Sequence, residues 1–313
     1  MIINTGQRTD IPAFYPVWLA NRLKEGFVCV RNPYNPVQVS RYRLSPEVVD
    51  VIGFCSKNPA PFFEYLDLLE GYGQFWYVTI TCYDKDIEPG VPEKSQVLED
   101  FKYLSKKVGI NSIGWRYDPI FIDDKYTVEY HLQSFEKMAE TLDGYTKIVV
   151  ISFIDIYEKV KRNFPEAKAV SAEDKLYLGR KMIEIASAHG MVVRPCAEGD
   201  FLEKYGADCS GCMTLPVYEK AIGKHLVPPK SKVKSAREDC SCYLGADIGT
   251  YDTCRHFCRY CYANNDLIQV KNNQLLHNPK SPFLIGDYRQ DDIIHDVEQK
   301  SWVDNQMDIF QFL

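Results

Sequence analysis

The spacing of short apolar segments constrains the fold of this chain most strongly. Runs of three to six residues, rich in branched aliphatic and aromatic side chains, alternate with longer amphipathic stretches, and this pattern is typical of strands and helices around a parallel sheet. The eight expected strands are Ile2–Thr5, Phe27–Val30, Val49–Phe54, Trp76–Thr81, Ile113–Trp115, Ile148–Phe153, Met191–Arg194 and Tyr243–Ile248. The expected helices are Ala13–Glu25, Pro61–Glu70, Val97–Val108, Val128–Leu142, Ala172–His189 and Pro216–Ile222. The count predicts an α/β fold, either a TIM-like (βα)8 barrel or a related barrel.

The expected barrel takes up most of the chain. We therefore expect a single domain over residues 1–265, including a cysteine-rich loop at 240–262, followed by a C-terminal extension and tail over 266–313. The sequence has no apolar run near the roughly 18 to 20 residues that a membrane span requires, and its first residues do not read as a signal peptide. We expect a cytoplasmic protein with no membrane partner.

Charged side chains follow most of the expected strands. In a barrel the carboxyl ends of the strands surround one cavity, so these side chains are expected to meet there. The candidates for substrate contact or catalysis are Arg8, Asp10, Arg31, Lys57, Arg116, Asp118, Asp155, Arg194 and Glu198. Each one taken singly is more often a loop cap or a surface ion pair. Together they predict a pocket for an anionic substrate.

The cysteines give the clearest functional signal. The chain has 11 cysteines, and a reducing compartment disfavours disulfides, so closely spaced thiols there are expected to bind metal or to react. Cys254, Cys258 and Cys261 form C-x3-C-x2-C, with Tyr260 just before the last thiol. Three thiolates can hold three irons of a [4Fe-4S] cluster and leave the fourth iron open. S-adenosylmethionine occupies that open iron in radical enzymes, so the cluster and this cofactor are both expected, with Tyr260 beside the adenine.

Other assignments of the same thiols stay open. A zinc ion would need four nitrogen or sulfur ligands, which Cys240, Cys242 or His256 could complete, giving a zinc-stabilised barrel that binds a nucleic acid or a protein partner. Alternatively, Cys240 or Cys242 could cap the fourth iron, as in a non-catalytic or electron-transfer protein. Cys209 and Cys212 could join Cys240 and Cys242 in a second metal site, or they could form a redox pair.

Several segments resemble one known family. They are GQRTDIPAFYPVWLANRL, FVCVRNPYNPVQVS, FCSKNP, GWRYDPI, ISFIDIYEKV and DIGTYDTCRHFCRYCYANN. They resemble the prokaryotic family called domain of unknown function 1848 over nearly the whole chain, and CRYCYA is also similar to spore photoproduct lyase relatives. The resemblance implies a C-terminal cluster, at Cys254, Cys258 and Cys261 with Tyr260, like the N-terminal one of radical S-adenosylmethionine proteins. In those proteins the cysteine loop follows the first strand, whereas here it follows the eighth, which neighbours the first in a closed barrel. The expected glycine-rich segment for the methionine amine is not evident near Ile2–Gly6.

Charge and the C-terminal tail bear on partners. The net charge of −6 argues against nucleic-acid binding through bulk electrostatics, although a local basic patch could contact phosphate. The tail Gln306–Phe310 resembles the short peptide by which bacterial DNA-processing proteins dock on the sliding clamp, and would otherwise pack back on the barrel. We therefore expect a substrate related to nucleic acid or nucleotides, with an electron donor if the protein is catalytic.

Overall fold

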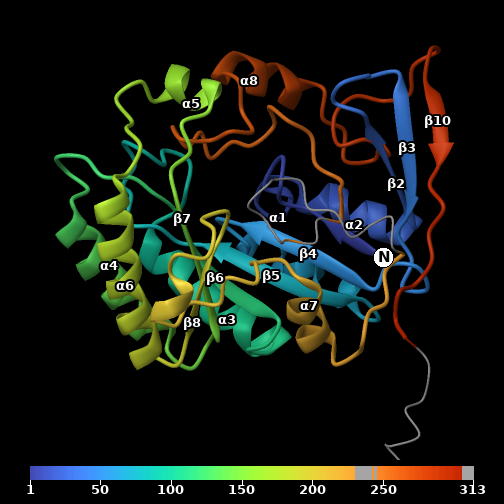
Figure 1. Ribbon diagram of the computed structural model, residues 1–313. Coiled ribbons are helices and arrows are strands. Elements are labelled where there is room, and N and C mark those ends of the chain that lie inside the picture. Colours follow the sequence, from blue (N-terminus) through green and yellow to red (C-terminus); the bar gives the residue numbers. More distant parts are fainter. Residues whose placement is uncertain (230–241, 243–244, 305–313) are drawn as a thin grey trace, which may run out of the picture.

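A parallel sheet forms the centre of the protein, whose computed structural model describes residues 1–229, 242 and 245–304. Its order is β8-β7-β6-β5-β4-β1-β9, and all six pairings are parallel (Figure 1). The strands are β1 (Ile2–Asn4), β4 (Val51–Ser56), β5 (Gly73–Thr79), β6 (Ile113–Ile120), β7 (Ile148–Phe153), β8 (Val192–Pro195) and β9 (Ala246–Asp247). The expected α/β fold is therefore confirmed.

The last strand of the sheet lies beside the first. Ile3 of β1 is in register with Ala246 of β9, and Asn4 with Asp247. The loop after β9 therefore begins next to the loop after β1, as the sequence predicts for strands one and eight. β8 and β9 form the two edges of this sheet, so the part of the chain that the structure describes shows an open sheet and not a closed barrel.

The second expected strand belongs to another sheet. Phe27–Val30 lies in β2 (Phe27–Arg31), which pairs antiparallel with β3 (Gln38–Arg43), and β3 pairs in parallel with β10 (Ile293–Asp296). Figure 1 shows these three strands apart from the parallel sheet. A short apolar run indicates a strand but not its partner, and the close antiparallel partner β3 was not foreseen. The prediction that this strand forms part of the barrel was wrong.

The structure has helices in the predicted segments and in others, and several of them pack on the parallel sheet. They are α1 (Ile11–Phe14), α2 (Pro16–Glu25), α3 (Lys94–Val108), α4 (Val128–Leu142), α5 (Glu158–Asn163), α6 (Ala172–Ala188), α7 (Leu215–Ile222) and α8 (Leu267–Leu275), with 3-10 segments η1 (Ala60–Leu69) and η2 (Glu203–Tyr205). Thr127 and Ser171 cap α4 and α6 by accepting hydrogen bonds from backbone N–H groups. Within the described residues, no helix is long and apolar enough to cross a membrane.

Aromatic side chains fill the layer between the sheet and its helices. Phe54 stacks on Trp76 with ring centroids 3.7 Å apart, and Trp115 stacks on Phe135 of α4 at 4.7 Å. These four side chains are completely buried, and each contributes about 1.5–3 kcal/mol or more through removal of apolar surface from water. This core holds the strands in place and leaves their carboxyl ends free to build a site.

The C-terminal extension packs back on the sheet domain. The indole N–H of Trp18 donates to the carbonyls of Ser281 and Phe283, both at 3.0 Å. The backbone N–H of Trp302 donates to Asp50 at 2.8 Å. Residues 266–304 are thus part of the same packed body, while the clamp-like segment Gln306–Phe310 lies outside the described residues.

Candidate functional site

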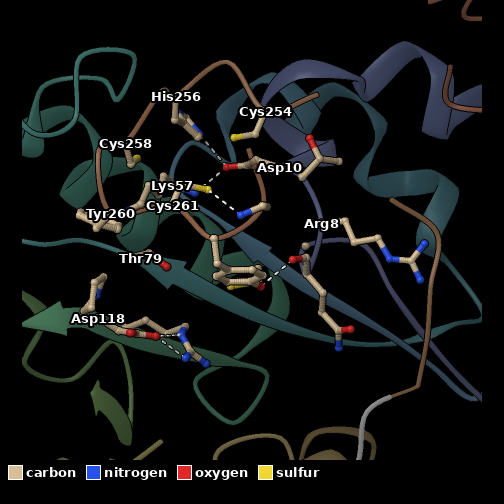
Figure 2. A pocket seen from close by; sticks show the side chains of 18 of the residues that line it. Arg8, Asp10, Lys57, Thr79, Asp118, Cys254, His256, Cys258, Tyr260 and Cys261 are labelled. Carbon is tan, nitrogen blue, oxygen red and sulfur yellow. Dashed lines mark hydrogen bonds and ion pairs between the residues drawn. The ribbon is translucent and has the colours of Figure 1, made fainter. Parts of the chain in front are cut away.

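A cavity of about 560 Å³ lies at the carboxyl ends of the parallel strands. Figure 2 shows its three labelled cysteines around Asp10 and Lys57, with Thr79 and Asp118 below them in this view. The predicted site residues that line it are Arg8, Asp10, Lys57, Arg116, Asp118, Asp155, Cys212, Cys242, Cys254, Cys258, Tyr260 and Cys261. Most of the side chains selected at the strand ends therefore share one cavity.

Three other predicted site residues do not line this cavity. Arg31 lies in β2 of the separate sheet and forms an ion pair with Asp292. Arg194 forms an ion pair with Asp208, and Glu198 is bound to a lysine of α6. All three were selected because they follow expected strands, but local charged partners hold them elsewhere. The expectation that they contact substrate finds no support in their positions.

The loop that carries Cys254, Cys258 and Cys261 is closed on itself. The backbone N–H of Asp252 donates to the carbonyl of Ala263 at 3.1 Å, and the Asp252 carboxylate accepts from the side-chain amide of Asn265 at 2.7 Å. The amide of Asn264 donates to the carbonyl of Cys254 at 2.8 Å. Phe257, within the motif, has a positive φ of 54°. These bonds shape the loop before anything is bound to it.

The same loop is docked against the segment after β5. The backbone N–H of Gly90 donates to the carbonyl of His256 at 2.9 Å, and that of Arg259 donates to Ile87 at 3.0 Å. A Cβ atom on Gly90 would lie 2.3 Å from the carbonyl oxygen of Arg255. Only glycine allows the two backbones to approach so closely, so Gly90 determines where the thiols sit.

Asp10 connects the cysteine loop to the sheet. One carboxylate oxygen caps α1 by accepting from Ala13 at 3.1 Å. The other accepts from the backbone N–H of Lys57 at 2.7 Å and lies 2.8 Å from Nε2 of His256. Nδ1 of His256 lies 3.2 Å from the carbonyl of Gly90. Both ring nitrogens thus face oxygen acceptors, which leaves neither one available to a metal in this arrangement.

The three loop thiols lie in surroundings that disfavour bare thiolates. Burial raises the pKa of Cys254 well above its ordinary value, and the nearby Cys261, Asp10 and Cys258 raise it further. Burial likewise raises the pKa of Cys258 and of Cys261, although Lys57 opposes this rise at both. A metal centre bound between the three thiols would lower their pKa values, because metal ligation requires the thiolate form.

A buried ionic group lies behind the cysteine loop. The Glu88 carboxylate forms ion pairs with Lys57 and Lys94, and it accepts hydrogen bonds from the hydroxyls of Tyr260 and Thr81. Burial alone would raise the pKa of Glu88, but the two ammonium groups lower it to about 2. The Lys57 ammonium also lies over the Tyr260 ring, 5.6 Å from its centroid. This group orients Lys57 and Tyr260 toward the cavity.

Polar atoms that lack hydrogen-bond partners occur at the end of β1, in the segment after it and in the cysteine loop. The Asn4 side-chain amide, Nε2 of Gln7, Oγ1 of Thr9 and Oδ1 of Asn264 are buried without a hydrogen-bond partner, and all four residues line the cavity. Unsatisfied buried polar atoms are costly, so each one calls for an explanation, such as a bound group or a water molecule. Sequence reasoning missed these residues because it selected charged side chains after expected strands, and these side chains are uncharged.

Gly6 explains how this segment reaches the cavity. A Cβ atom on Gly6 would lie 2.3 Å from the carbonyl oxygen of Cys55 in β4. The chain therefore runs against the neighbouring strand, and Gln7 donates its backbone N–H to Asp247 of β9 at 2.9 Å. The carbonyl of Gln7 accepts from the hydroxyl of Tyr262 in the cysteine loop at 2.6 Å.

Aromatic side chains and guanidinium groups complete the cavity wall. Tyr34 lines it with 92% of its surface exposed, and Tyr251 lies 5.6 Å from the guanidinium carbon of Arg8. Deeper in the cavity, Arg116 forms an ion pair with Asp118. Flat rings and cations around one cavity are groups that can contact an aromatic base.

A second group of thiols also lines the cavity. The sulfur of Cys212 lies 3.5 Å from that of Cys196 and 3.1 Å from that of Cys242. Cys209, which the sequence groups with Cys212, does not line the cavity. Cys240 lies outside the described residues. Within residues 1–229, 242 and 245–304, no three or more His, Cys, Asp or Glu side chains are already spaced to hold a metal ion.

Comparison with protein families identifies the family of this chain. The family model described as Domain of unknown function (DUF1848) matches residues 2–263, which include the parallel sheet and the cysteine loop. No curated protein matches the chain.

Proposed function

This chain belongs to the family described as Domain of unknown function (DUF1848), and from its site we propose that it is a radical S-adenosylmethionine-type enzyme. Cys254, Cys258 and Cys261 would hold a [4Fe-4S] cluster. The observation that carries this proposal is that three thiols of one preshaped loop, of which Cys258 is buried, line a cavity beside polar atoms that have no hydrogen-bond partner.

The residues around the thiols fit the implied cofactor. Because β9 lies beside β1, the cysteine loop is next to the segment Gly6–Asp10. This is where the loop would lie if the strand order of a radical S-adenosylmethionine protein were circularly permuted. The unpartnered side chains of Asn4, Gln7 and Thr9 offer hydrogen bonds for the amino and carboxylate groups of a methionine moiety. Gly6 lets this segment run close to β4. It is a single glycine, whereas the resemblance implied a glycine-rich segment at this place.

Each nearby side chain then has a role. When bound, the cluster supplies the electron that splits the sulfonium of the cofactor into methionine and a 5′-deoxyadenosyl radical. Lys57 balances the negative charge of the three thiolates, and Glu88 holds that ammonium in place. Tyr260 presents its ring to the cavity while its hydroxyl is fixed by Glu88. Asp10 positions the loop through His256.

We further propose that the substrate carries a nucleobase. Tyr34 and the adjacent pair of Tyr251 and Arg8 line the cavity and would offer rings for stacking, which accepts any base. Arg116 with Asp118 can present a charged pair to a phosphate or to polar base edges. The net charge of −6 favours a small nucleotide or a single extruded base over long nucleic acid held by bulk charge.

The alternative metal assignments fit the geometry less well. A zinc ion at the loop would need a fourth ligand, but both ring nitrogens of His256 face oxygen acceptors. Cys242, which would cap the fourth iron in an electron-transfer protein, lies 3.1 Å from Cys212 in the other thiol group. Among the residues that the structure describes, which exclude Cys240, an open iron is therefore the better match.

Anaerobic reconstitution tests the proposal. The wild-type chain is expected to hold about four irons and four sulfides, and to form 5′-deoxyadenosine when it is reduced in the presence of S-adenosylmethionine. Cys258→Ala should lose both properties, while Cys29→Ala, a thiol of the separate sheet, should keep them. A reconstituted wild-type cluster that yields no 5′-deoxyadenosine would defeat the enzymatic proposal, and failure to bind iron would defeat the cluster itself.

A further inference from the structure

The thiols of Cys196, Cys212 and Cys242 have no role in the proposed reaction. They come from three separate segments: Cys196 follows β8, Cys212 precedes α7, and Cys242 precedes β9. Their sulfurs nevertheless converge, at 3.5 Å from Cys196 to Cys212 and 3.1 Å from Cys212 to Cys242. The segments that carry Cys196 and Cys212 are also joined by a hydrogen bond from Arg194 to the carbonyl of Gly211 at 2.8 Å. The three sulfurs therefore meet in a fixed setting, and this convergence indicates a shared bound group.

The spacing of the sulfurs selects the kind of group. A zinc ion with Zn–S bonds of about 2.3 Å in a tetrahedral site places its sulfurs about 3.8 Å apart. The sulfurs would therefore have to spread by a few tenths of an ångström, which rotation of the cysteine side chains supplies. A disulfide would need about 2.05 Å instead. An iron-sulfur cube puts each cysteine on a different iron, and so requires wider separations than these.

Hydrogen bonds around the sulfurs favour the thiolate form that a metal requires. The backbone N–H of Met213 donates to the sulfur of Cys242 at 3.3 Å, and Nη1 of Arg116 donates to the sulfur of Cys212 at 3.6 Å. Donors aimed at ligand atoms are the usual outer support of a metal site. Arg116 is buried and carries a positive charge that offsets part of the charge of three thiolates.

We propose that Cys196, Cys212 and Cys242 bind a soft divalent cation of the zinc class, separate from the iron-sulfur site. Binding releases the thiol protons to solvent. All three residues line the cavity, so the remaining coordination position is reached from the cavity and takes water or a donor atom of the substrate. This inference does not depend on the proposed radical chemistry.

The test uses the full-length chain with the first site disabled. In the variant Cys254→Ala/Cys258→Ala/Cys261→Ala, elemental analysis after purification is expected to find about one zinc per chain. Adding Cys212→Ser should reduce the zinc at least tenfold. Adding Cys209→Ser instead, which changes the nearby thiol outside the group, should leave the zinc unchanged. Equal zinc in both, or loss on Cys209→Ser alone, would overturn the proposal.

A measurement on the wild-type chain covers the case in which a variant does not fold. A mercurial reagent is titrated against the thiols while a zinc-sensitive dye reports released metal, and about one zinc per chain should be released. Peptide mapping should then show that the thiols modified at that step are Cys196, Cys212 and Cys242. Release of no zinc, together with a Cys212–Cys242 disulfide in protein purified without oxygen, would show a redox pair and refute the metal site.

Discussion

Replacing Glu88 by Gln tests the ionic group that supports the cysteine loop. The side chain keeps its size but loses its charge, so Lys57 and Lys94 are left with no carboxylate between them. Glu88 is 1% exposed, and water cannot take its place. Removing one member of a buried ion pair is strongly destabilising because the remaining charge stays buried.

The size of the effect follows from the pKa of Glu88. Its pKa falls from 4.5 to about 2, a difference of about 2.5 units, which corresponds to about 3 kcal/mol of stability at neutral pH. Burial lowers the pKa of Lys94 despite this ion pair, so part of the gain is offset. We expect Glu88→Gln to lower the free energy of unfolding by about 2–3 kcal/mol.

The pH dependence has a defined sign. Because the pKa of Glu88 is lower in the folded state, its contribution is fully present above about pH 4.5 and disappears as the pH falls toward 2. The difference in the free energy of unfolding between the wild type and Glu88→Gln should therefore be constant from pH 7 to about 5 and should become smaller at lower pH.

Urea denaturation of the metal-free chain measures both quantities. Glu93→Gln is the matched control, since its side chain is 78% exposed and its ion pair with Lys85 is also exposed; it should change stability by less than about 0.5 kcal/mol. An effect of Glu88→Gln no larger than that of the control, or one that stays constant as the pH is lowered to 3, would refute the reasoning.

Three further predictions concern the cavity. Gly6→Ala places a Cβ atom 2.3 Å from the carbonyl oxygen of Cys55, and should lower the free energy of unfolding by about 1–3 kcal/mol; an unchanged urea midpoint would show that the two strands can separate freely. Asn4→Leu removes a buried amide that has no hydrogen-bond partner, so the thermal midpoint of the metal-free chain should stay equal or rise. In the reconstituted protein, the same change should weaken binding of S-adenosylmethionine at least tenfold; an unchanged affinity would show that Asn4 is not part of the cofactor site. Tyr34→Ala alters a ring that is 92% exposed, and should leave the thermal midpoint unchanged while weakening a nucleobase ligand by about 1–3 kcal/mol in a binding titration; equal affinity would count against base stacking.

Much of the fold could be predicted because single segments carry strong local signals. Val128–Leu142 and Ile148–Phe153 match α4 and β7 at both ends, since amphipathic periodicity and a β-branched run each determine one element. The sequence placed the last strand beside the first only for a closed barrel; β9 does lie beside β1, but at the edge of an open sheet. What local patterns cannot supply is the choice of sheet, and Phe27–Val30 was assigned to the wrong one for that reason.

The candidate site was predictable where it lies in one segment. Cys254, Cys258 and Cys261 share a loop, so their spacing alone predicted that they face one cavity. The thiol group of Cys196, Cys212 and Cys242 joins three distant segments, and the sequence suggested Cys209 in place of Cys196 because C-x2-C is the familiar spacing. The unpartnered amide of Asn4 is a property of packing, which no residue pattern records.

The central claim is that three cysteines of one loop hold a cluster with an open iron. Electron paramagnetic resonance of the anaerobically reconstituted and reduced chain tests this most directly, with and without S-adenosylmethionine. We predict the signal of a reduced [4Fe-4S] cluster whose g values change when the cofactor is added, because the cofactor binds the open iron. A chain that takes up no iron, or a cluster signal identical with and without the cofactor, would contradict the account.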